Sequence, residues 1–161
     1  MNSRGQALMI ELIGALFVFL LVFLFLQNLW PQNITRWNTE VEYRTMYNRA
    51  VSQASNLVES QGYPTNWTSD DVNIVGLAKK KNVLDQNKIE EYAKLETSDY
   101  NLSKHQMKFF EYDFWVEIDS ENNALDKNIG KKPPQDSKIV SIQRIVALEG
   151  KNAVFRLSVF R

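Results

Sequence analysis

The chain has 161 residues, no cysteine, one histidine and a formal net charge of zero, with nineteen basic and nineteen acidic side chains. The balanced charge disfavours nucleic acid as a partner, and the lack of cysteine excludes disulfides and thiol chemistry. With a single histidine and no glycine-rich phosphate loop, most metal and nucleotide sites are excluded too. We therefore expect no enzyme, no cofactor and no bound metal.

The amino-terminal residues form a short polar leader followed by an apolar run. From Ala7 to Leu26 the one ionisable side chain is Glu11. At ~1.5 Å per residue, a helix over this run is about 30 Å long, enough to cross the hydrocarbon core of a bilayer. The run therefore predicts a single-pass cell-membrane protein. The positive-inside rule places its amino terminus in the cytoplasm and its carboxyl-terminal part outside the cell.

Glu11 is the charged exception in this run. Placing a lone carboxylate in lipid costs at least ~2.5–3.5 kcal/mol on insertion scales. Such a carboxylate favours a partner that another molecule supplies. The alternative is a position in the headgroup layer with no specific partner.

The same residues carry a family resemblance. Arg4-Gly5-Gln6, placed before an apolar helix with an early glutamate, resembles the class III signal peptide of archaeal type IV pilin-like proteins. The resemblance implies that a prepilin peptidase removes the leader and that the helix packs with other pilin subunits in a surface filament. It also implies that Glu11 neutralises the new amino terminus of a neighbouring subunit. We predict cleavage between Gly5 and Gln6; cleavage between Gln6 and Ala7 is the alternative, because it places Glu11 fifth in the mature chain.

The middle of the chain predicts three helices and one strand. Imperfect three-to-four spacing of apolar residues predicts a helix over 35–60, after a break near Pro31. An apolar stretch over 72–78 predicts a short strand. Asp85 and Asp99 are predicted to cap two further helices, which run to residues 96 and 108.

The carboxyl-terminal third is predicted to consist mainly of strands. Apolar and polar residues alternate over 110–119, which predicts a strand with one buried face. The polar segment 119–138 is predicted to be an exposed loop. Within it, the loop 119–126 offers oxygen donors for a calcium ion, without EF-hand spacing, at Asp119, Glu121, Asn123 and Asp126. The runs 139–148 and 153–160 predict a hairpin with Gly150 or Asn152 in the left-handed conformation.

Four short segments are also similar to archaeal pilin-like proteins, and the resemblance implies structural roles for them. They are Gly62-Tyr63-Pro64-x-x-Trp67, Val75-Gly76-Leu77-Ala78, Val83-Leu84-Asp85-x-x-Lys88 and Tyr112-Asp113-Phe114.

These elements predict an α+β fold of the type IV pilin-like kind. A long hydrophobic amino-terminal helix would continue into an amphipathic helix packed on a small antiparallel β-sheet head domain. We expect residues 1–5 to be the leader, 6–30 the hydrophobic transmembrane and assembly helix, and 31–161 the extracellular head. Three sequons make Asn33, Asn66 and Asn101 candidate N-glycosylation sites.

The predicted function is that of a pilin-like structural subunit of a cell-surface type IV-like filament, with a role in adhesion. Its predicted partners are membrane lipid, the prepilin peptidase and other pilin subunits, and no nucleic acid. The alternative is a single-pass, membrane-anchored surface binding domain that does not polymerise.

Overall fold

The computed structural model describes the backbone of residues 3–120 and 127–161. It describes the side chains of residues 9, 11–27, 37, 39–120 and 127–161. The chain divides into two compact units, Met1–Glu42 and Tyr43–Arg161.

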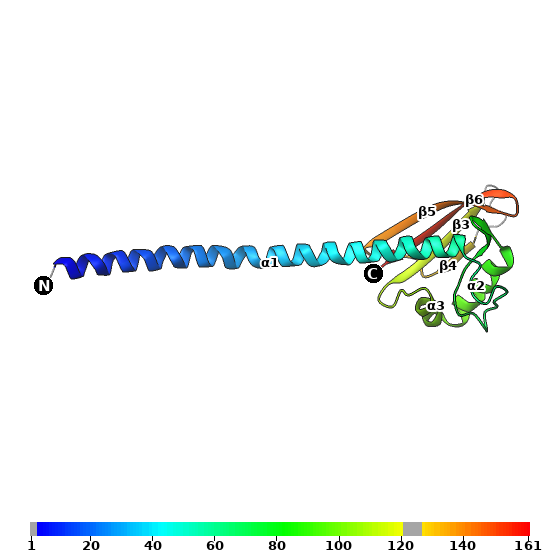
Figure 1. Ribbon diagram of the computed structural model, residues 1–161, viewed down its shortest axis with the longest axis horizontal. Helices are drawn as coiled ribbons and strands as arrows, with labels where there is room; N and C mark the ends of the chain where they lie inside the picture. The colour runs from blue at the N-terminus through cyan, green and yellow to red at the C-terminus, as the bar shows by residue number, and fades with distance from the viewer. Residues whose placement is uncertain (1–2, 121–126) are drawn as a thin grey trace. The chain divides into compact units, whose positions relative to one another are not determined.

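The first helix, α1, spans Ser3–Glu59 and is drawn from blue to cyan-green in Figure 1. It provides the described part of the first unit and enters the second. The helix predicted over 35–60 lies almost wholly within it, but the predicted break near Pro31 is wrong. Proline removes one backbone hydrogen bond, and the turns on both sides of Pro31 nevertheless keep helical geometry.

The second unit is built on one mixed sheet. Its strands are β1 (Ala78–Lys80), β2 (Val83–Leu84), β3 (Asp113–Ser120), β4 (Lys127–Gly130), β5 (Ile139–Leu148) and β6 (Lys151–Phe160). They lie in the order β1-β2-β5-β6-β3-β4, and the larger strands are seen together in Figure 1. All neighbours are antiparallel except β2 and β5, which are parallel.

This sheet corrects the predicted fold class. The class is α+β, but the small antiparallel sheet is wrong, because the sheet has six strands among the described residues and includes a parallel pair. The predicted strand over 72–78 is also wrong, since only Ala78 of that stretch lies in a strand. Strands of two to four residues, such as β2 and β4, are too short to show an alternation of apolar and polar residues.

Two shorter helices follow the predicted positions closely. Helix α2 spans Gln86–Ser98, and the Asp85 carboxylate accepts a hydrogen bond from the Asn87 amide at 3.0 Å. Helix α3 spans Tyr100–Gln106, and the Asp99 carboxylate accepts from the Leu102 amide at 2.9 Å. Both predicted caps are therefore confirmed.

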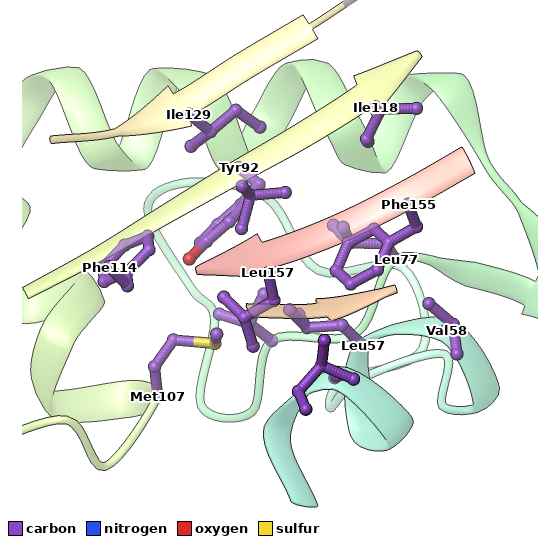
Figure 2. Close-up of a cluster of buried hydrophobic side chains, with 14 of the residues drawn as sticks. Leu57, Val58, Leu77, Tyr92, Met107, Phe114, Ile118, Ile129, Phe155 and Leu157 are labelled. Carbon is purple, nitrogen blue, oxygen red and sulfur yellow. The ribbon is translucent and has the colours of Figure 1, made fainter. Parts of the chain in front are cut away.

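The core lies between one face of the sheet and the three helices. Along α1 the buried side chains Met46, Ala50, Ala54 and Leu57 recur every three to four residues, so they form one stripe on the helix. They share a cluster with alternate residues of β3 and β6, such as Phe114 and Leu157. Figure 2 shows this cluster, with Leu57 and Val58 of α1, Tyr92 of α2 and strand side chains gathered together.

The hairpin β5–β6 is confirmed with a tight turn. Glu149 and Gly150 both have positive φ, 51° and 78°, as a two-residue turn matched to twisted strands requires. The sequence left open whether Gly150 or Asn152 is left-handed. Gly150 is the left-handed one, and Asn152 lies within β6.

Candidate assembly surface

Among the described residues, exposed apolar side chains are concentrated in the segment 12–26 of α1, called the apolar segment below. Every side chain in it is apolar, and its leucine, isoleucine, valine and phenylalanine side chains are between 46% and 71% exposed. Phe19 and Phe23 stack on each other, one turn apart, with ring centroids 6.2 Å apart. Because consecutive residues are all apolar, the helix presents apolar groups on every side.

A helix with no polar side is ordinarily buried on all sides. Full burial of one leucine, valine or phenylalanine side chain is favourable by about 1.5–3 kcal/mol. Several such residues together exceed the ~4–15 kcal/mol cost of bringing two molecules together. We therefore expect the segment to be buried against another molecule.

The prediction that this helix crosses a membrane is wrong. Among the described residues, no helix has a stretch that is both long enough and apolar enough to do so. The uninterrupted apolar segment begins only after Glu11, and at ~1.5 Å per residue its length is about 22 Å, against roughly 30 Å for a hydrocarbon core.

This correction extends to the predictions that depended on a membrane helix. It overturns the long hydrophobic transmembrane helix of the predicted fold and the single-pass cell-membrane placement, with a cytoplasmic amino terminus and an extracellular head. It also overturns the class III signal peptide assigned to the leader. The alternative function, a binding domain that does not polymerise, stays a prediction.

Glu11 lies immediately before the apolar segment, and its side chain is exposed. The carboxylate would therefore be covered together with the segment if another molecule packed there. Gly5, Gln6 and Ala7 lie within α1, but their side chains are outside the described residues. Cleavage after Gly5, or after Gln6, stays a prediction.

The three sequons differ in their surroundings. Asn66 and Asn101 are exposed, whereas the Asn33 side chain lies outside the described residues. The Thr68 hydroxyl, two residues after Asn66, donates to Asp71 at 2.9 Å on the surface. The Ser103 hydroxyl, two residues after Asn101, is buried and donates to the Tyr92 hydroxyl at 3.3 Å. Glycosylation of these asparagines stays a prediction.

The acidic residues of β3 form ion pairs. Glu117 accepts from Arg156 on β6 at 2.9 Å, and its neighbour Asp119 lies 3.9 Å from the same guanidinium. Asp113 accepts hydrogen bonds from the Lys104 ammonium at 2.9 Å and from the Tyr100 hydroxyl at 3.0 Å. These contacts tie α3 and β6 to β3 and occupy the carboxylates.

Three of the segments that resemble pilin-like proteins meet at the end of α1. The Trp67 indole donates to the Gly76 carbonyl at 3.1 Å, and the Lys88 ammonium donates to the Gln61 carbonyl at 2.5 Å. Lys88 is only 8% exposed, and burial lowers the pKa of its ammonium although Asp85 opposes that effect. Nothing in the sequence indicates that this lysine is buried, because its partners lie far away along the chain.

No family model, curated protein or solved structure matches the chain. Among the described residues, no group of three or more His, Asp and Glu side chains is placed to hold a metal ion. The loop considered for calcium falls largely on residues 121–126, which lie outside the described residues.

Proposed function

We propose that this chain is a pilin-like structural subunit of a type IV-like filament, and that it polymerises through the apolar segment of α1 with other copies of itself. The observation that supports the proposal is the exposure of Leu12 to Leu26 on every side of one helix. A partner that buries one stripe of this helix would leave the opposite side in water. Several copies packed around one another bury all sides at once.

The organisation of the chain supports the same proposal. The second unit, Tyr43–Arg161, has its own buried core, so folding does not use the apolar segment. The segment is thus available for contacts between copies. The resemblance of the four short segments in the second unit to pilin-like proteins points to the same kind of assembly.

Electron microscopy and sedimentation of the full chain test this function. We expect regular filaments of the wild-type protein. A variant with Leu16→Gln and Leu20→Gln keeps the helix but places two amides in the apolar segment, and we expect it to remain dispersed.

The matched control places the same two amides, one helical turn apart, outside the segment. Tyr43→Gln combined with Tyr47→Gln replaces two exposed side chains of α1 in the second unit, and this variant should polymerise normally. Dispersed monomers of the wild type, or equal polymerisation of all three proteins, would contradict the proposal.

A further inference from the structure

The carboxyl-terminal end of α1 is fastened to the rest of the second unit by an unusual set of bonds. The last carbonyls of a helix have no partner within it and need one elsewhere. The Leu57 carbonyl accepts from the Leu77 amide at 2.9 Å, and the Val58 carbonyl accepts from the Asn82 amide at 2.8 Å. The Ser60 carbonyl accepts from the Ala78 amide at 3.1 Å.

Asn82 continues this connection into the sheet. Its carbonyl accepts from the Ala147 amide of β5 at 2.8 Å, and its φ of 60° is left-handed. Asn82 therefore connects two elements. Its amide bonds to the end of α1, and its carbonyl bonds to the sheet. Asparagine adopts this conformation more readily than most residues.

Lys88 holds the two sides of this connection together. From α2 its ammonium reaches the Gln61 carbonyl, just after α1, at 2.5 Å and the Ala78 carbonyl of β1 at 3.4 Å. A buried ammonium is tolerated only where it is hydrogen-bonded, and bonds to a charged donor are stronger than neutral ones. Figure 2 shows the side chains of Leu57, Val58 and Leu77 within the core.

We infer that the end of α1 is a mechanical joint, in which Lys88 and Asn82 pass tension from the helix to β5 of the sheet. Subunits held in a filament by the amino-terminal part of α1 would transmit any load on the second unit through this helix. The inference rests on the proposed polymerisation, because polymerisation is what would place α1 under load. The contacts themselves lie within one chain. The inference is therefore tested on single molecules, where a failure to polymerise has no effect.

The test is single-molecule force measurement on the full chain in two pulling directions. The chain contains no cysteine, so two introduced cysteines define the handles. Handles at the exposed Asn48 and Arg161 load α1 against the sheet, whereas handles at Glu111 and Arg161 load the adjoining ends of β3 and β6. Lys88→Met is compared with Lys94→Met, which removes an exposed lysine of the same helix, ion-paired with Glu91.

We expect Lys88→Met to rupture roughly tenfold faster at equal force when α1 is loaded, because two carbonyls lose their charged donor. It should behave like the wild type when β3 and β6 are loaded, and Lys94→Met should match the wild type in both directions. Equal weakening of Lys88→Met in both directions would show a general loss of stability and overturn the inference. So would wild-type behaviour of Lys88→Met in both.

Hydrogen exchange of the wild-type protein provides a second measurement if Lys88→Met does not fold. The amides of Leu77 and Asn82, which bond to α1, should exchange as slowly as the Leu157 amide of β6, the strand between β5 and β3. Faster exchange of Leu77 and Asn82 would mean that the junction opens before the sheet, and would overturn the inference.

Discussion

The Trp67 indole nitrogen donates to the Gly76 carbonyl oxygen at 3.1 Å, and this bond closes the loop that follows α1. Trp67 is 3% exposed, so its polar atom is satisfied within the core. Gly62 lies against the same ring, where a Cβ would come 2.6 Å from the indole nitrogen. The two glycines and the tryptophan therefore form one closely packed unit.

Gly76→Ala should destabilise the protein strongly. A Cβ at this position would collide with the backbone of Ser60 and Gly62, and backbone atoms cannot move aside as a flexible side chain can. We expect a loss of about 2–3 kcal/mol in the free energy of unfolding, typical of an overpacked core site. Urea unfolding measures it, with Ser52→Ala, at an exposed position of α1 outside the apolar segment, as the control. Equal stability of Gly76→Ala and the wild type would show that the loop is not packed as described.

Tyr92 should make the fold sensitive to alkaline pH. Burial raises the pKa of its phenol well above its ordinary value, although the Ser103 hydroxyl bond opposes this. A phenol with a raised pKa stabilises the fold below its unfolded pKa of about 10, and that contribution is lost as the pH rises further. Tyr92→Phe should cost about 1 kcal/mol at neutral pH, because Ser103 loses its acceptor.

The pH dependence of unfolding by urea separates these effects. Above pH ~10, Tyr92→Phe should lose stability less steeply than the wild type. The exposed Tyr63 provides the control substitution, Tyr63→Phe. Parallel curves for the wild type and Tyr92→Phe would contradict the burial of the Tyr92 hydroxyl.

Asp113 should contribute to stability against acid. Burial alone would raise the pKa of its carboxyl, but hydrogen bonds from Lys104 and Tyr100 outweigh burial and lower it. A lowered pKa stabilises the fold above the unfolded value of about 3.9, and that contribution is lost as the pH falls through the folded value. Asp113→Asn should therefore cost about 1 kcal/mol at neutral pH, a value discounted for its partial exposure.

Unfolding curves measured from neutral to acid pH test this prediction. The deficit of Asp113→Asn relative to the wild type should shrink as the pH falls below ~4. Asp136→Asn, in the exposed loop between β4 and β5, serves as the control. A deficit that is constant across the pH range would show that the charge of Asp113 is not what stabilises the contact.

Glu11→Ala should lower polymerisation without unfolding the second unit. In an assembly that covers the apolar segment, the Glu11 carboxylate is covered too and needs a partner, and chains packed out of register leave it unpaired. Filament yield by sedimentation checks this prediction, with the exposed Glu90→Ala on α2 as the control. Normal polymerisation of Glu11→Ala would refute the role of Glu11.

The sequence predicted those elements whose pattern is local. Alternating residues along β3 identified its buried side chains, including Phe114 and Ile118, and the capping aspartates marked the starts of α2 and α3. Phe110, at the start of the same alternation, is 57% exposed because β3 begins only at Asp113.

Features that depend on distant contacts could not be predicted in this way. The parallel pairing of β2 with β5 joins Val83 to Ala147, and a two-residue strand carries no pattern of its own. Lys88 was unremarkable as a helical lysine, since its burial depends on the Gln61 carbonyl 27 residues earlier. The apolar segment was recognised from its composition, but the prediction that it crosses a membrane was wrong.

Disulfide cross-linking between copies is the most direct test of assembly through α1. Because the chain has no cysteine, Leu20→Cys places one thiol in the middle of the apolar segment, and Asn152→Cys places one at an exposed position beside the β5–β6 turn. We expect mild oxidation of the assembled protein to join Leu20→Cys chains into covalent dimers, whereas Asn152→Cys chains should remain largely single. Dimers through Asn152→Cys with none through Leu20→Cys would show that copies associate elsewhere, and would contradict assembly through α1.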